Sequence, residues 1–179
     1  MPEFVYDLDP ASFITIGALG PPGQRTFYLQ ATQGSIVVSL IIEKEQAQAL
    51  SSSLDQLLEA LEKRYPQGEG AVQDVNYDMA LLQPVNGLWR VGQMGLGYDE
   101  AADLIILVAQ ELIFEEDDEL EEPEVVRLTG TRRQMEALSR HATSIVGQGR
   151  PLCPLCHNPK DPQGHFCPPS NGHRDPVEL

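Results

Sequence analysis

Residues 150–179 limit the possible folds of this chain more than any other stretch. All three cysteines lie there, at positions 153, 156 and 167, and a histidine at position 165 precedes the last of them. The spacing, C-x2-C-x8-H-x-C, predicts a zinc knuckle, in which one tight turn presents two thiolates and a second loop supplies two more ligands. Because few apolar residues surround these positions, we expect the stretch to fold only around a bound metal ion.

The predicted ligands form a Cys3His set, which zinc binds tetrahedrally. They are Cys153, Cys156, His165 and Cys167. Four protein ligands leave no coordination position open for water or substrate, so we predict a structural rather than a catalytic zinc ion. Pro154 presets the backbone for a tight turn after the first cysteine. We expect Asn158 to take the left-handed conformation that glycine often supplies in such turns.

Three alternatives to this ligand set stay open at this point. His157 or His173 could replace His165 as the fourth ligand. Cys153 and Cys156 could instead form a redox-active dithiol pair. Such pairs usually open a helix that lowers the thiol pKa, however, and here prolines flank the cysteines. The stretch could also lack both a metal ion and a fixed structure.

Residues 1–148 are predicted to form an α+β body. Runs rich in β-branched and aromatic residues, separated by turn residues, predict its strands. They are a short edge strand at Phe4–Tyr6, followed by Phe13–Gly17, Arg25–Thr32, Ser35–Ile42, Leu88–Gly95, Asp103–Phe114 and Glu124–Leu128. Leucines at helical spacing predict a helix over Glu43–Arg64, and a T-x-x-Q capping box predicts a second helix from Thr131 to Val146.

These elements predict a largely antiparallel six-stranded sheet with both helices on one face, an α+β fold followed by the knuckle at residues 149–179. Three strands and a helix occur in residues 13–64 and again in residues 88–146. An internal duplication is one interpretation, and chance alternation of hairpins and helices is the other. The intervening residues 66–87 are predicted to be a long connection, with a short strand at Tyr77–Leu82.

Composition and charge narrow the function classes. The longest apolar runs, Ser35–Ile42 and Leu104–Ala109, are far shorter than the roughly 20 residues of a membrane span. Because no secretory signal is visible, we expect a cytosolic protein without membrane contact, in which clustered thiols more often bind metals than form disulfides. The net charge of −15 at pH 7 argues against nucleic acid as a partner. The strongly acidic Glu115–Glu124 is expected to be a solvated loop.

Few other residues suggest chemistry. The sequence contains no Ser-His-Asp pattern, no HExxH motif and no cofactor fingerprint. His141 lies beside the apolar stripe of the second predicted helix, so we expect a partly packed side chain rather than a catalytic one. Arg25, Arg90 and Arg127 fall on predicted strands, where pairing with carboxylates is the favoured expectation and an anion-binding face is the alternative.

Several segments resemble an uncharacterised bacterial family that is classified as a domain of unknown function. They are Gly23–Ala31 (GQRTFYLQA), Gly149–Cys156 (GRPLCPLC), Asp161–Pro168 (DPQGHFCP) and Asn171-Gly172. The resemblance covers nearly the whole chain, from Phe4 to Arg174. It implies a β-rich body with a metal-binding tail, and it places the ligands at the same four positions as the spacing does. It implies no activity.

Two functional hypotheses follow. The first is a non-enzymatic interaction or adaptor protein that contacts a protein partner and whose C-terminus is stabilised by zinc. The second is an enzyme or accessory subunit that acts on a small anionic metabolite, with Arg25, Arg90 or Arg127 lining a pocket. Arginines that converge in one concave pocket would favour the second hypothesis, and arginines dispersed among carboxylates would disfavour it.

Overall fold

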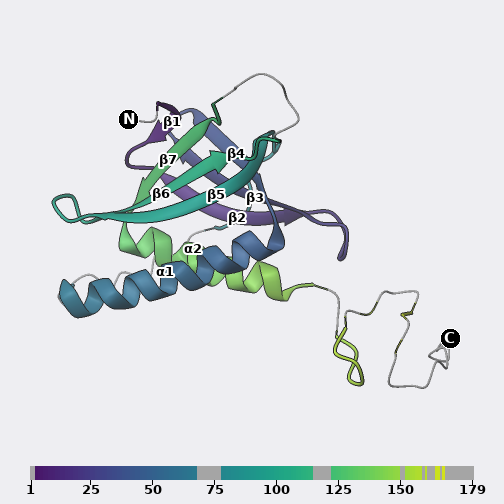
Figure 1. Ribbon diagram of the computed structural model, residues 1–179. Helices are drawn as coiled ribbons and strands as arrows, with labels where there is room; N and C mark the ends of the chain where they lie inside the picture. Colours follow the sequence, from purple (N-terminus) through teal and green to yellow (C-terminus); the bar gives the residue numbers. More distant parts are fainter. Residues whose placement is uncertain are drawn as a thin grey trace.

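The computed structural model describes residues 3–67, 78–114, 122–149, 152–158, 160, 164–165 and 167 (Figure 1). In chain order the elements are β1 (Phe4–Leu8), β2 (Phe13–Leu19), β3 (Thr26–Gln33), β4 (Ile36–Ile42), α1 (Lys44–Arg64), β5 (Gly87–Asp99), β6 (Leu104–Glu111), β7 (Val125–Gly130) and α2 (Arg132–Gly147). The predicted α+β class is therefore confirmed. Neither helix combines the length and the apolar character that crossing a membrane requires, within the part of the chain that the structure describes.

The strands form one sheet in the order β1-β7-β6-β5-β4-β3-β2. Neighbours are antiparallel except for β1 beside β7 and β4 beside β5, which are parallel. The sheet has seven strands rather than the expected six, because the N-terminal edge strand pairs with β7, from Phe4 opposite Val125 to Leu8 opposite Leu128. This pairing joins opposite ends of the body, and local sequence patterns carry no information about it.

The sheet is strongly curved, as the connection between β1 and β2 requires. Seven flat strands at a spacing of about 4.8 Å would place the two edge strands about 29 Å apart. Only residues 9–12 join β1 to β2, and a fully extended connection of that length spans at most about 18 Å. Its backbone also bonds to strands of both halves, from Ala11 N to Thr129 O at 2.8 Å and from Ser12 N to Thr32 O at 2.7 Å. The sheet therefore curls enough for the end of β1 and the start of β2 to lie within reach of this short connection.

Both helices pack on the same side of the sheet (Figure 1). The α1 helix buries Leu50, Leu54 and Leu61, which lie on one face because they follow one another at intervals of four and seven residues. The predicted capping box begins α2, since Thr131 Oγ1 accepts from Gln134 N at 3.2 Å and Gln134 Oε1 accepts from Thr131 N at 2.9 Å. The most deeply buried side chains of the core are Leu8, Ile14, Ile16, Leu29, Leu40, Ile42, Leu54, Ile105, Leu107, Leu128, Met135 and Leu138.

Residues 78–84, here called the 78–84 segment, cover the other face of β2 and β3. Thr15 Oγ1 donates to Met79 O at 2.6 Å, and Gln30 accepts from Leu82 N at 2.7 Å and donates to Leu82 O at 3.1 Å. Both Thr15 and Gln30 are fully buried, so these bonds satisfy polar groups that the strands place away from the core. The short strand expected at Tyr77–Leu82 was wrong for residues 78–82, which have no strand pairing, and Tyr77 lies outside the described residues.

The order of three strands and a helix occurs twice, as β2-β3-β4-α1 and as β5-β6-β7-α2. The third strand of the first set, β4, lies parallel to the first strand of the second set, β5. The two sets therefore lie side by side in the sheet with the same direction. A duplication remains a prediction. The acidic segment expected to be a loop is described only at residues 122–124, and residues 115–121 lie outside the described residues.

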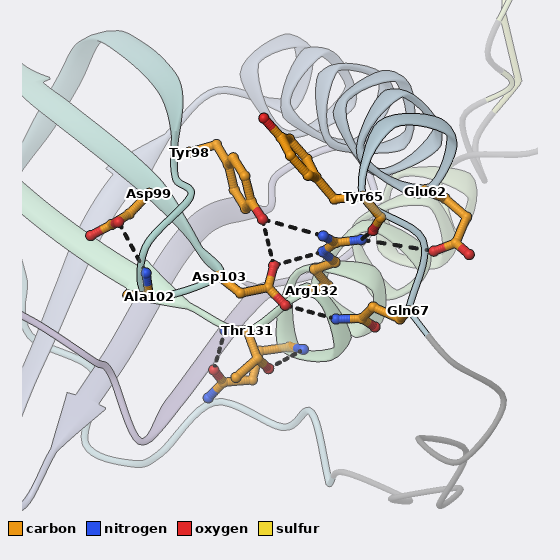
Figure 2. Close-up of polar contacts among 10 residues, drawn as sticks. Glu62, Tyr65, Gln67, Tyr98, Asp99, Ala102, Asp103, Thr131 and Arg132 are labelled. Atoms are coloured by element: carbon orange, nitrogen blue, oxygen red, sulfur yellow. Dashed lines mark hydrogen bonds and ion pairs between the residues drawn. The ribbon is translucent and has the colours of Figure 1, made fainter.

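A buried arginine ties the ends of both helices to the turn between β5 and β6 (Figure 2). Arg132 donates to Asp103 Oδ1 at 2.9 Å, to Tyr65 O at 2.8 Å and to Tyr98 Oη at 3.2 Å. Tyr98 Oη also donates to Asp103 Oδ1 at 2.7 Å, and Gln67 Nε2 donates to Asp103 Oδ2 at 3.0 Å. Arg132 is 7 % exposed, and its charge and its N–H groups have partners. We therefore infer that this network holds the two helices against the turn between β5 and β6.

Candidate metal centre

The first two cysteines of the tail lie on one tight turn. Cys153 O accepts a hydrogen bond from His157 N, and Cys153 N donates to Asn158 O, both at 2.9 Å. The turn needs one residue with a left-handed backbone, and that residue is His157, with φ of 58°. The expectation that Asn158 takes this conformation was wrong by one position, because the bond from His157 N closes the turn one residue earlier.

The structure brings the side chains of Cys153, Cys156, His165 and Cys167 together. Their ligand atoms all lie within 4.8 Å of one another. Cys153 Sγ and Cys167 Sγ are 3.9 Å apart, and Cys156 Sγ is 3.3 Å from His165 Nε2. Tetrahedral zinc, with Zn–S near 2.3 Å and Zn–N near 2.05 Å, gives separations of about 3.8 Å and 3.6 Å. The four residues therefore fit one tetrahedral metal ion.

The pKa values of Cys153 and Cys167 are shifted in opposite directions. Backbone N–H groups of Cys156 and Leu155 donate to the Cys153 sulfur and lower the pKa of Cys153 to about 6. Burial, together with the neighbouring thiols Cys153 and Cys156, raises the pKa of Cys167 to about 11. Since metal ligation needs thiolates, a divalent cation would supply the charge that lets the buried Cys167 ionise.

The alternative ligands have different outcomes. The side chain of His157 is exposed and does not belong to the group of four, so the structure brings His165 rather than His157 to the cysteines. His173 lies outside the described residues. The 3.9 Å between the sulfur atoms of Cys153 and Cys167 is far longer than the roughly 2.05 Å of a disulfide bond. Metal binding by these four residues stays a prediction, and the geometry supports one shared ion.

Two leucines of the first cysteine turn face solvent, one just before Cys153 and one just before Cys156. Leu152 is 62 % exposed and Leu155 is 59 % exposed, whereas Cys153 between them is 2 % exposed. The turn therefore directs its sulfur inward and its leucines outward.

The other candidate residues lie apart from the cysteines. Arg127 pairs with Asp7 at 2.6 Å and with Asp9 at 3.5 Å, as expected for a strand arginine in an acidic chain. Arg90 pairs with Glu43, but Arg90 and Arg25 also line one cavity. His141 is half-buried, as expected.

Burial of His141 lowers its pKa, and a backbone hydrogen bond to Ile16 opposes that effect. A half-buried imidazole with a backbone partner fits the expected packing role rather than a catalytic one.

Sequence reasoning missed two sets of residues. Arg132, Asp103 and Tyr98 form a network between segments about 30 residues apart, and no local pattern marks it. Lys44 lines the same cavity as Arg25 and Arg90. A signal for Lys44 was present, because it is the first residue of a helix, where acidic residues are favoured over basic ones.

One protein family matches most of the chain. The family model described as "Protein of unknown function (DUF3090)" matches residues 6–167. The matched range includes both helices and ends on Cys167, so it covers all four clustered Cys and His residues. No curated protein and no solved structure matches the chain. The expected resemblance to an uncharacterised family is confirmed.

Proposed function

Since the chain belongs to a family of proteins of unknown function (DUF3090), which carries no activity over to it, we propose a function from the site itself. The protein is a non-enzymatic interaction module whose C-terminal end is fixed by a structural zinc ion. The observation that carries this proposal is the group of four ligand atoms within 4.8 Å of one another, from Cys153, Cys156, His165 and Cys167.

Zinc is the metal that best fits this donor set. Three sulfurs and one imidazole nitrogen are soft or borderline ligands, and a tetrahedral set of this kind selects zinc or an iron–sulfur centre rather than magnesium or calcium. One histidine and three cysteines around a single ion are a common structural zinc set. Because four protein ligands fill the coordination sphere, the ion would hold the tail in place and would not activate water.

A protein is the partner that best fits the exposed surface. The bound ion would fix the turn that presents Leu152 and Leu155, so a partner could bury both leucines without first ordering the turn. The net charge of −15 favours a partner surface with basic residues around an apolar groove. The same charge disfavours nucleic acid and anionic membranes. Paired thiolates and zinc suit a reducing compartment, so we place the protein in the cytosol.

The metal is tested first, with the full chain purified without added metal. Elemental mass spectrometry should give about one zinc per chain, and a native thiol titration should find the three cysteines slow to react. Absence of metal together with fast-reacting thiols would overturn the proposal and favour the dithiol redox alternative for Cys153 and Cys156.

The interaction role is tested by comparing variants in a quantitative affinity purification from cells of the source organism. A partner enriched by the wild-type chain should be lost with L152S/L155S and after zinc removal. The matched control is I36T/V37T, which changes two exposed apolar residues of β4 that are 43 % and 49 % exposed. Equal enrichment by wild type and L152S/L155S would contradict the proposed surface.

The alternative of an enzyme or accessory subunit acting on a small anionic metabolite stays a prediction. Of its three arginines, Arg127 on β7 pairs with two carboxylates, those of Asp7 and Asp9. Arg25 and Arg90 do line one cavity. That cavity supplies groups that can bind an anion, and among the described residues that line it no pattern of catalytic groups suggests a reaction.

A further inference from the structure

A cavity of about 430 Å³ lies where β3, β5 and the first turn of α1 meet the residues that follow α2. Its volume falls in the range of small-molecule sites, about 300 to 1,000 Å³. Three basic residues line it: Arg25 just before β3, Lys44 at the start of α1 and Arg90 on β5. In a chain with 27 acidic and 12 basic residues, this concentration of cations is unusual.

Two of these cations are available for a ligand. Arg25 is positioned by a bond from Nη1 to Ile145 O at 3.1 Å, and its guanidinium carbon lies 5.0 Å from the centre of the Phe27 ring. Arg90 is paired with Glu43. Within the part of the chain that the structure describes, no carboxylate forms an ion pair with Arg25 or Lys44.

The charges of Arg25 and Lys44 converge on one point. A Cβ atom placed on Gly149 would lie 3.1 Å from Lys44 Nζ and 3.8 Å from Arg25 Nη2. Two positive groups that face the same space repel each other, and an anion between them would convert this repulsion into attraction. The absence of a side chain at Gly149 leaves that space open.

We propose that this cavity binds the phosphate group of a small hydroxylated metabolite. Arg25 supplies a planar fork of donors and Lys44 a mobile point charge, and both recognise phosphate oxygens. Lys44 is the first residue of α1, and the positive end of the helix dipole adds to its charge, although the Glu43 side chain already accepts from the N–H group of Gln46. Phe27, Ile42 and Leu152 give the cavity apolar walls, and the carboxylates of Glu43 and Glu45 can accept hydrogen bonds from ligand hydroxyls. This binding site goes beyond the proposed interaction role and does not rest on it.

The test is a titration of the full-length protein, as purified, with glycerol 3-phosphate at constant ionic strength. The signals of the Gly149 amide and the Arg25 Nε–H group are followed by ¹H–¹⁵N NMR. They should shift saturably, whereas acetate should shift them at least about ten-fold more weakly because it carries one negative charge instead of nearly two. Linear shifts without saturation, or acetate binding as tightly as glycerol 3-phosphate, would overturn the proposal.

Three variants and one control distinguish a built site from general attraction. R25Q and K44Q each remove a charge-assisted bond and should weaken binding about ten-fold or more. G149V leaves the charge unchanged but fills the space between the cations, so it should weaken binding too. K63Q changes an exposed lysine of the same helix that pairs with Glu59, and its affinity should equal that of the wild type. Because Lys44 is exposed, K44Q should fold normally. Affinity equal to that of the wild type in both K44Q and G149V would refute the site.

Discussion

Replacement of Arg132 by methionine should destabilise the body by about 2–3 kcal/mol. Removing one partner of a buried ion pair costs about 3–5 kcal/mol. The side chain of Arg132 is 8 % exposed, but that of its partner Asp103 is 45 % exposed, so water can hydrate the carboxylate after the change. Because of that hydration, we expect the loss of stability to be smaller than the loss for a fully buried pair. For a chain of this size each kcal/mol lowers the unfolding midpoint by about 2–4 °C, so we expect a decrease of about 4–12 °C.

The effect of R132M should depend on pH in a defined direction. Burial raises the pKa of Asp103, but hydrogen bonds from Tyr98, Gln67 and Arg132 outweigh it, so the pKa lies below the ordinary value of 3.8. A carboxyl group with a lowered folded-state pKa stabilises the fold above its unfolded pKa, and this contribution is lost as the pH falls through the folded pKa. The difference between wild type and R132M should therefore be full above about pH 5 and shrink below about pH 3.8.

Urea unfolding followed by circular dichroism measures this difference at several pH values. The matched control is R140M, on the same helix, because Arg140 is 78 % exposed and pairs only with Glu136 one turn away among its described contacts. Its free energy of unfolding should change by about 0.5 kcal/mol or less. If R132M were no more destabilising than R140M, the network in Figure 2 would not hold the helices against the β5–β6 turn as we infer.

Three further outcomes follow from buried groups. Q30L leaves the N–H and carbonyl of Leu82 without their side-chain partner and should lower the free energy of unfolding by about 2–3 kcal/mol; an unchanged urea midpoint would argue against the role of the 78–84 segment. L54A empties a fully buried position and should cost about 2–5 kcal/mol in thermal unfolding, and a cost below 1 kcal/mol would contradict its core placement. Acidification from about pH 7 to about pH 4 should release the metal to a zinc indicator, because protons compete for thiolates and imidazole, while the far-ultraviolet spectrum of the body persists. Metal retained at about pH 4 would count against a Cys3His site.

The persistence of the body in that last experiment has a structural reason. The apolar cluster that forms the core draws its described residues from Leu8 to Ala142 and includes none of the clustered cysteines. Cys153 and Cys167 are buried, but they are buried against each other and the rest of the turn. The division into a body at residues 1–148 and a tail at residues 149–179 predicts this independence, and the experiment tests it.

Local patterns in the sequence were sufficient to predict most elements and the candidate ligands. Hydrophobic periodicity identifies α1 and α2, and the capping box at Thr131 and Gln134 is visible because it depends on residues three positions apart. The spacing of Cys153, Cys156, His165 and Cys167 is informative for a similar reason. Few protein structures other than a metal site require three thiols and an imidazole so close in a chain.

Contacts between distant segments depend on the tertiary structure. The pairing of β1 with β7, the bonding of residues 11 and 12 to both β7 and β3, and the cover of β2 and β3 by residues 78–84 each join segments that no short-range pattern relates. The same holds for the convergence of Arg25, Lys44 and Gly149 on one cavity. The order of the amino acids was enough to indicate the metal ligands and the helix and strand segments, because these depend on the spacing of residues close together in the chain. The folded chain was needed to show which charges face each other, because burial and long-range pairing set those distances.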